Sequence, residues 1–371
     1  MRQIVLEEPR RFVAMHAELP GRADGHVLVR VSRVGVCGSD AHAFEGKQPF
    51  FTYPRILGHE LAVEVVEAPA NPRGIAPGDR CAVEPYLSCG RCHACGIGKS
   101  NCCEALQVLG VHVDGGMCGW LSVPVERLYK SDKLSLDQLA LVETLGIGAH
   151  AVERSGLRPG ENVLVVGAGP IGLAVTQFAL AAGGRVRVIE PNPIRRRCVS
   201  QLGVEAFDLG SAGALPDCRL TVDDGRLKDI HREDASSNRQ PAIGNRQIDE
   251  HAERPHGLAD VVIDATGNPK AMEASFNYVA HGGRLVFVGL AQALISFDDP
   301  LFHRREMTVL ASRNSCGEFP RIIDMIERGQ ISTDPWITHR MHLAEVPDRF
   351  PVLVCRPDCV KAIVEVTDED F

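Results

Sequence analysis

Short apolar runs separated by glycine and proline fill the first part of the chain. Residues 27–31, 61–66 and 80–83 are rich in valine, leucine and alanine, and a Pro-Gly-Asp turn signal at 77–79 precedes the third run. Apolar runs of this length that end at turn residues are typical of strands. The pattern predicts a β-rich domain of its own over residues 1–147.

Beyond residue 147 the pattern changes to strands that alternate with helices. The continuous apolar run at 163–166 is typical of a strand buried on both faces, and the segment after it has a helical apolar face. Alternation of this kind predicts βαβ units and a parallel sheet over residues 148–300. The strand-like runs of this part are residues 163–166, 186–190, 260–264 and 284–289.

Two later segments behave differently. Residues 301–371 contain an amphipathic segment around Ile322 and Ile326 and a strand-like run at 360–366, and we expect them to return to the first domain. Residues 217–256 show no period, and 16 of these 40 residues are charged. Because such a stretch buries little apolar surface, an exposed or disordered insertion is predicted, with a partner-binding role as the alternative.

A glycine-rich loop lies between the run at 163–166 and the helix predicted after it. Gly167, Gly169 and Gly172 have G-x-G-x-x-G spacing, which allows a tight turn and a close approach of the backbone to a pyrophosphate. Glu190 ends the second strand, where an acid binds the ribose of a dinucleotide. The turns after later strands should border the same coenzyme. The predicted coenzyme-binding residues are Gly167, Gly169, Pro170, Ile171, Gly172, Glu190, Arg195, Thr266, Val288 and Gly289.

Composition and charge narrow the class of protein. The 371 residues suit two domains, and a net charge of -8 at pH 7 argues against a large nucleic-acid surface. No run of about 18 apolar residues and no signal peptide is apparent, so neither membrane spanning nor export is predicted. Thirteen cysteines without an export signal favour metal ligands and buried thiols over disulfides, and a cytoplasmic location is expected.

The densest cysteine cluster lies at residues 89–103, where short gaps let successive ligands turn back onto one ion. Four thiolates enclose a tetrahedral zinc ion at about 2.3 Å with no open position, which is the structural type of zinc site. Spacing alone leaves Cys102 and Cys103 as alternatives for the fourth ligand. A structural zinc lobe is therefore predicted at about residues 84–106, and its other ligands would be Cys89, Cys92 and Cys95.

A more dispersed set of metal-ligand residues comes earlier in the chain. Cys37 and His42 belong to one short segment, and His59 and Glu60 belong to another. A zinc ion with three protein ligands keeps its fourth position open, and it acidifies a bound water or alcohol. Glu143, near the predicted junction of the domains, is another acid with access to such a metal. The set predicts a catalytic zinc site.

Together these motifs resemble the zinc-dependent medium-chain dehydrogenase/reductase superfamily. The resemblance covers nearly the whole chain apart from the insertion, and the cysteine run and the Gly-His-Glu sequence at 58–60 are its most specific motifs. The chain is most similar to the branch that holds polyol dehydrogenases, threonine dehydrogenases and hexonate 5-dehydrogenases. Residues 53–60 and 108–116 resemble the hexonate members.

The resemblance implies an α/β fold with a Rossmann-type doubly wound parallel sheet and a β-rich GroES-like catalytic domain. It implies two zinc ions per chain, NAD as coenzyme, and a homodimer or homotetramer. The implied catalytic residues are Ser39, His42 and Glu60, of which the first two would carry the substrate proton away. The implied ligands are Cys37, His59 and either Glu60 or Glu143 for the catalytic zinc, and Cys89, Cys92, Cys95 and Cys103 for the structural zinc.

We therefore expect reversible oxidation of a secondary alcohol of a polyol or hexonate to a ketone, with hydride transfer to NAD. A threonine dehydrogenase-like or general alcohol dehydrogenase activity is the alternative. A zinc-poor NADPH reductase of the same superfamily would lack the four-cysteine lobe. A non-enzymatic zinc-binding regulator would not need the dinucleotide motif. The substrate is a small molecule, and no nucleic-acid or membrane partner is expected.

Two further hypotheses concern the choice of substrate and coenzyme. His112 and Lys47 are candidate partners for the carboxylate of a hexonate. Glu190 should accept hydrogen bonds from the ribose and repel the 2′-phosphate of NADP, which favours NAD. The basic run at 195–197 is expected to open the next helix with its side chains in solvent, although its position would also suit that phosphate.

Overall fold

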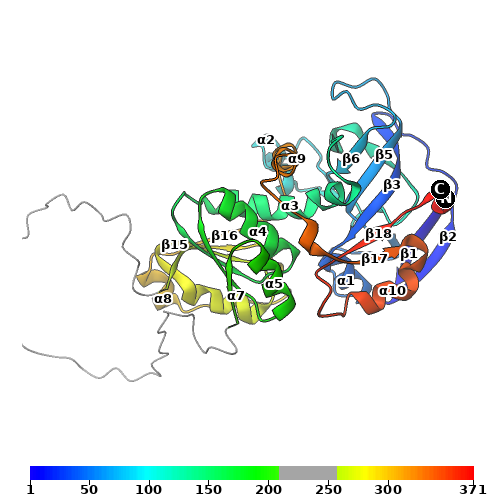
Figure 1. The fold of residues 1–371 in the computed structure, drawn as a ribbon. Coiled ribbons are helices and arrows are strands. Elements are labelled where there is room, and N and C mark those ends of the chain that lie inside the picture. Colours follow the sequence, from blue (N-terminus) through cyan, green and yellow to red (C-terminus); the bar gives the residue numbers. More distant parts are fainter. Residues whose placement is uncertain (209–256) are drawn as a thin grey trace, which may run out of the picture.

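The computed structural model describes residues 1–208 and 257–371, and the structural statements below refer to these residues. The predicted insertion at 217–256 lies outside them. Figure 1 shows two lobes, and both termini of the chain lie side by side on the lobe that contains the N-terminal strands. No helix in the described ranges is long and apolar enough to cross a membrane.

A mixed sheet of seven strands forms the first lobe. Its strands, in order across the sheet, are β10 (Leu128–Lys130), β6 (Arg80–Val83), β5 (Glu60–Glu67), β3 (His26–Val36), β18 (Lys361–Glu365) and β17 (Ile337–His342), with β9 (Trp120–Pro124) also paired to β3. Val27, Val29 and Val31 of β3 are fully buried, as the two-residue period of a strand requires. Because β18 pairs with β3, the end of the chain lies in the same sheet as its beginning.

Smaller elements complete this lobe. Phe12, Phe44 and Phe350 pack together with ring centroids 5.2 to 5.6 Å apart, which joins an edge strand to two helices. These smaller elements are a sheet of β2 (Arg11–His16), β1 (Arg2–Glu8) and β4 (Arg55–Ile56), a pair of β7 (Tyr86–Leu87) and β8 (Gln107–Val108), and the helices α1 (Gly38–Phe44), α2 (His93–Gly96) and α10 (Val346–Leu353).

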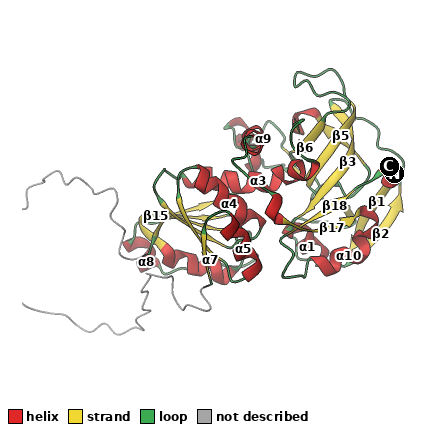
Figure 2. Ribbon diagram, viewed as in Figure 1, coloured by secondary structure: helices red, strands yellow, loops and turns green. Residues whose placement is uncertain are grey.

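A six-stranded sheet forms the second lobe, and all its neighbouring strands are parallel. Its order is β13 (Glu205–Phe207), β12 (Arg185–Ile189), β11 (Asn162–Val166), β14 (Ala259–Asp264), β15 (Val279–Phe287) and β16 (Thr308–Ala311). This is the doubly wound Rossmann order, in which ligands bind at the carboxyl ends of the two central strands. The predicted fold class is confirmed. The helices of this lobe, red in Figure 2, are α4 (Pro170–Ala181), α5 (Pro193–Gln201), α7 (Pro269–Ser275) and α8 (Asp299–Arg304).

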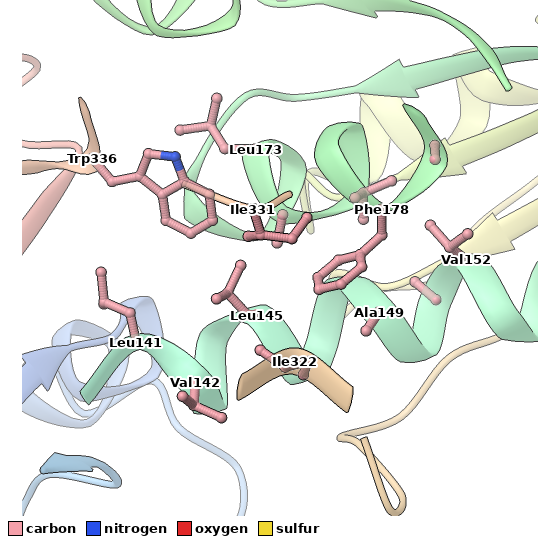
Figure 3. Close-up of a cluster of buried hydrophobic side chains, with 14 of the residues drawn as sticks. Leu141, Val142, Leu145, Ala149, Val152, Leu173, Phe178, Ile322, Ile331 and Trp336 are labelled. Carbon is pink, nitrogen blue, oxygen red and sulfur yellow. The ribbon is translucent and has the colours of Figure 1, made fainter. Parts of the chain in front are cut away.

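The long helix α3 (Leu136–Ser155) lies between the two lobes (Figure 1). It begins at a capping box on Ser135 and ends at Gly156, whose φ of 61° is the left-handed conformation that glycine favours. In Figure 3, its apolar side chains face Leu173 and Phe178 of α4, together with Ile322 of α9 (Phe319–Glu327). These residues belong to one buried cluster that also includes side chains of β5 and β6. The shared core therefore fixes one lobe against the other.

The predicted strands of the second lobe are present in the structure, but several predicted boundaries differ from those observed. The predicted strand at 186–190 ends one residue earlier, at Ile189, so Glu190 is the first residue after β12. The change of pattern at residue 148 falls inside α3, and this helix packs against both lobes. The segment after residue 301 also serves both, because β16 pairs with β15 whereas β17 and β18 lie in the first sheet.

Candidate active site and metal centres

The end of β3 and the start of β5 bring three metal-ligand side chains together. Cys37 follows β3 and occupies the N-cap of α1, while His59 and Glu60 stand at the start of β5. Gly35 is opposite Glu60 in the strand register, and a Cβ atom on Gly35 would lie 2.0 Å from Glu60 Oε2. One ligand atom from each of Cys37, His59 and Glu60 lies within 4.8 Å of the other two.

Buried carboxylates surround this group. Asp40, Glu60 and Glu143 are each at most 4% exposed. The buried Lys361 donates to both carboxylate oxygens of Glu60 at 2.6 and 2.7 Å, and His59 Nδ1 lies 3.6 Å from Asp40 Oδ1. Lys361 thus pairs with one of the three buried acids. Because buried charge requires compensation, a divalent cation fits this set of donor atoms.

Burial and neighbouring charges shift the pKa values of these groups. Burial opposes protonation of His59, but Asp40 and Cys37 raise the pKa of its imidazole well above the ordinary value. Burial raises the pKa of the Asp40 carboxyl and of the Glu143 carboxyl. Metal ligands bind in their deprotonated forms, so a zinc ion at these atoms would replace the protons that the site otherwise attracts.

Glu60 and Glu143 occupy different positions at the site. Glu60 belongs to the group within 4.8 Å, but Lys361 engages both of its oxygens. Glu143 is a buried residue of α3, and Tyr86 Oη donates a hydrogen bond to its Oε1. Both acids therefore stay candidates for the third protein ligand of a catalytic zinc.

Helix α1 carries the two residues predicted to relay a proton. Ser39 is half-buried in its first turn, two residues after Cys37, and His42 is exposed in its last turn. No hydrogen bond joins the two side chains in the described part of the chain. Their arrangement leads from the metal-ligand group toward solvent, and the relay itself stays a prediction.

The cysteine lobe converges on one point. Cys92 Sγ lies 3.5 Å from Cys95 Sγ, and a backbone hydrogen bond from Cys95 lowers the pKa of the Cys92 thiol to about 6. The thiolate is the form that binds zinc. Cys102 is exposed and lies outside the group, so the geometry favours Cys103 as the fourth ligand. The sulfur atoms that lie within 4.8 Å of one another are those of Cys89, Cys92, Cys95 and Cys103.

The glycine-rich loop joins β11 to α4 at the centre of the parallel sheet. Gly167 has a φ of 93°, and a Cβ atom on Gly172 would lie 1.9 Å from the Gly167 carbonyl oxygen. Only glycine permits this packing. Pro170 and Ile171 form the first turn of α4, whose unpaired N–H groups offer a binding site for an anion. The loop therefore fits the pyrophosphate of a dinucleotide.

Glu190 is tied to the loop by its carboxylate. Its Oε2 accepts a hydrogen bond from the Ala168 N–H at 2.7 Å, and its Oε1 accepts one from the Asn192 N–H at 2.8 Å. The side chain is buried. Each carboxylate oxygen has a second lone pair, so these bonds orient the acid without preventing contact with ribose hydroxyls.

The prediction that the arginines after Glu190 point into solvent is wrong for two of the three. Arg197 is exposed, but Arg195 and Arg196 are half-buried, and Arg196 donates to the Glu190 carbonyl oxygen at 2.8 Å. Arg195 Nη1 would lie 3.9 Å from a Cβ atom on Gly169. Helix α5 begins three residues after Glu190, and this short connection directs Arg195 back over the glycine-rich loop.

The turns after β14 and β15 lie next to each other at the same end of the sheet. Thr266 Oγ1 donates to Asp264 Oδ1 at 2.7 Å, and the Val288 N–H donates to the Asp264 carbonyl oxygen at 2.9 Å. A Cβ atom on Gly289 would lie 2.2 Å from the Gly267 nitrogen. The structure thus brings Thr266, Val288 and Gly289 together beside the central strands.

Comparison with known proteins identifies the family. The alcohol dehydrogenase GroES-like domain matches residues 23–133, and the zinc-binding dehydrogenase domain matches residues 241–328. L-galactonate-5-dehydrogenase of Escherichia coli (strain K12) is 38% identical over 351 residues, which are 94% of each chain. The chain belongs to the zinc-dependent medium-chain dehydrogenase/reductase superfamily. The resemblance inferred from the sequence motifs is confirmed.

Other members of the superfamily are also similar. Sorbitol dehydrogenase of Bacillus subtilis (strain 168) is 27% identical, with 98% of this chain and 97% of that protein covered. A putative zinc-binding dehydrogenase of Sinorhizobium meliloti 1021, solved with NADP, superposes with a TM-score of 0.82 at 28% identity, with 98% of each chain covered.

Three residues of this dehydrogenase join the candidate site without having been predicted from the sequence. Asp40 lies in the same short segment as Cys37, and its burial beside His59 appears only in the fold. Lys361 interrupts the apolar run at 360–366, so the sequence alone could have predicted a charged side chain in a buried strand. No feature of the sequence indicated that Tyr86 would be the hydrogen-bond partner of Glu143.

Proposed function

We propose that this dehydrogenase reversibly oxidises a secondary alcohol of a polyol or hexonate to a ketone, with NAD as the hydride acceptor. The observation that carries the proposal is the convergence of Cys37, His59 and Glu60, whose ligand atoms lie within 4.8 Å of one another, with Glu143 buried on α3. The similarity to L-galactonate-5-dehydrogenase and sorbitol dehydrogenase supports the substrate class.

Two zinc ions per chain are part of the proposal. When bound, the catalytic ion would stabilise the charge that develops on the substrate oxygen as its proton leaves. The cysteine lobe offers four thiols and no open position, so its ion would contribute to folding and not to chemistry. The proposed ligands are Cys37, His59 and Glu60 or Glu143 at the catalytic site, and Cys89, Cys92, Cys95 and Cys103 at the structural site.

Residues of the chain would hold the coenzyme and move the proton. Ser39 would accept the proton of the substrate hydroxyl, and His42 would pass it to solvent. The N-terminus of α4 would bind the pyrophosphate, and Glu190 would accept hydrogen bonds from the ribose. The turns at Thr266 and Val288 would border the nicotinamide half.

A coenzyme-reduction screen tests the proposal. The substrates are hexonates, their matching hexitols, threonine and simple secondary alcohols, each supplied with NAD and with NADP. We expect the fastest reduction of NAD with a hexonate or hexitol. Fastest turnover of threonine would support the threonine dehydrogenase alternative, and no reduction with any polyol or hexonate would refute the proposal.

A homodimer or homotetramer is proposed through the edge strand β16. This strand ends the parallel sheet of the described residues and has a strand partner on one side. Leu290, Leu294 and Val309 are large apolar side chains that are exposed, Leu294 to 94%. An unpaired edge strand that carries an exposed apolar side chain, here Val309, is a favourable place for a second copy. Light scattering should show more than one chain, and Val309→Lys should shift the population toward monomer.

A cytoplasmic location is proposed from the chemistry of the cysteines. All twelve cysteines of the described residues are free. Free thiols in this number are typical of a reducing compartment.

A further inference from the structure

Three cationic side chains stand near the residues that resemble hexonate dehydrogenases, and two of them are already paired. Lys47 Nζ lies 2.6 Å from Glu45 Oε2, and its side chain is 67% exposed. Arg55 Nη1 lies 3.2 Å from Asp114 Oδ1. Arg313 is exposed, and no carboxylate of the described residues lies within 4.0 Å of its guanidinium. Arg313 is therefore the cation of this group whose charge is still available.

A series of contacts connects Arg313 to the candidate metal site. Tyr86, which donates to Glu143, pairs with Val108 in the β7–β8 register. The Val108 N–H donates to His112 Nδ1 at 3.2 Å. The His112 ring stacks on Phe50 with centroids 6.4 Å apart, and the Arg313 guanidinium lies 6.0 Å from the same Phe50 ring centroid. Arg313 thus lies at the outer end of a series of contacts that begins at a candidate zinc ligand.

His112, which lies within this series of contacts, is a neutral hydrogen-bond donor. Its Nδ1 accepts from Val108, so the ring proton of the neutral form is on Nε2. Burial lowers the pKa of His112, and the charges of Arg313 and Arg55 lower it further. The sequence suggested two residues for a substrate carboxylate. Of these, His112 offers a hydrogen bond without charge, and the Lys47 ammonium is already paired with Glu45.

The segment that carries Arg313 is held in place and lined with polar atoms. Asn101 Nδ2 donates to the Arg313 carbonyl oxygen at 2.8 Å, and Asn314 has a left-handed φ of 51°. Ser315 is buried, its Oγ has no partner among the described residues, and it packs against Gly146, one turn of α3 beyond Glu143. A buried polar group without a partner needs one, and a bound ligand can provide it.

We propose that Arg313 binds the carboxylate of a sugar-acid substrate and thereby selects hexonates over the matching neutral hexitols. The inference rests on the proposed function. A guanidinium binds a carboxylate through two parallel charge-assisted hydrogen bonds, and a hexitol has no group that can replace them. His112 Nε2 would supply a further donor beside Phe50. Arg313 is thus a specificity-determining residue at the end of the substrate away from the reacting carbon.

The test compares Arg313→Gln with Lys47→Gln, which removes a positive charge that is already paired. In Arg313→Gln, kcat/KM for a hexonate should fall on the order of 10- to 100-fold, the range of a lost charge-assisted contact, and kcat/KM for its hexitol should not change. Lys47→Gln should leave both values unchanged. An equal loss on both substrates, or an unchanged preference for the hexonate, would overturn the inference.

Binding distinguishes this inference from the proposed function. Hexonate should raise the thermal unfolding midpoint of the zinc- and coenzyme-loaded enzyme, and Arg313→Gln should abolish that shift. If Arg313→Gln loses the shift but the wild type turns over no hexonate, the proposed reaction is refuted. The role of Arg313 in binding the carboxylate is then retained. A shift of equal size in both proteins would refute the role of Arg313, whatever the turnover.

Discussion

The two predicted metal sites differ in how the chain assembles them. The cysteine lobe takes all four ligands from residues 89–103, and three of its four cysteines are only half-buried. The catalytic set takes its groups from the same end of three neighbouring strands, β3, β5 and β18, and from α1 and α3, and its acids are buried. Its ion pair joins Glu60 to Lys361, which are 301 residues apart in the chain.

This difference has an energetic consequence. Thiols near the surface of a short loop stay hydrated when no metal is bound, and the loop gains its order from the ion. The acids of the catalytic set are buried by strands and helices, so their charge must be balanced by Lys361, by protons or by a bound cation. We therefore expect the lobe to need its ion for folding and the catalytic set to need its ion for chemistry.

Removal of His59 should give the largest effect on activity. His59→Ala takes a ligand from the catalytic set and leaves the glycine-rich loop untouched, so turnover should be abolished while NAD binding is retained. Metal analysis should find one zinc ion per chain in place of two. Steady-state kinetics and coenzyme titration provide the measurement, and a parallel loss of activity and NAD binding would contradict the separate roles assigned to these regions.

Removal of Cys92 should instead act mainly on stability. Cys92→Ser opens a closed four-thiol site, and we expect the loss of one zinc ion and a clear fall in the thermal unfolding midpoint. Thermal unfolding and metal analysis measure both. Cys102→Ser is the matched control, because Cys102 is exposed and outside the group. Retention of two ions by Cys92→Ser, or loss of one by Cys102→Ser, would show that the assigned ligands are wrong.

The same contrast explains what the sequence could and could not predict. The residues of the cysteine lobe and of the glycine-rich loop lie close together in the sequence. Their spacing was therefore enough to predict the candidate zinc ligands and the Rossmann strands. Asp40, Lys361 and Arg313 gain their roles from tertiary contacts with residues far away in sequence or on other elements. Arg195 was misplaced because propensity locates the start of a helix, whereas the direction of a side chain depends on the turn before it.

Breaking the buried ion pair of Lys361 and Glu60 should lower the free energy of unfolding more than breaking an exposed ion pair. Lys361→Met removes the lysine that contacts both oxygens of the buried Glu60 carboxylate, and the expected loss of unfolding free energy is about 3–5 kcal/mol. Lys130→Met is the control, because Lys130 is 45% exposed and lies 3.5 Å from Asp79, and its loss should be at most about 1 kcal/mol. Urea unfolding of the zinc-loaded proteins measures both, and equal losses would refute the special cost of burial at the catalytic set.

Coenzyme choice depends on a charge outside both metal sites. Glu190 is fixed by the N–H groups of Ala168 and Asn192, so its carboxylate cannot swing away from a 2′-phosphate. Like charges at close range repel, and NAD should therefore be preferred over NADP. Arg195 acts in the opposite direction, because its guanidinium lies over the loop near Gly169 and its Nε is buried without a partner among the described residues.

Glu190→Ser should narrow the preference for NAD by about tenfold, the equivalent of one charge-assisted contact. It removes the repulsion and leaves Arg195 free to receive the phosphate. Adding Arg195→Gln to Glu190→Ser should widen the preference again, whereas Arg197→Gln should not, because Arg197 is exposed. The measurement is the ratio of kcat/KM for the two coenzymes. If the wild type prefers NADP, or if Glu190→Ser leaves the ratio unchanged, coenzyme choice is decided by residues other than this acid and this arginine.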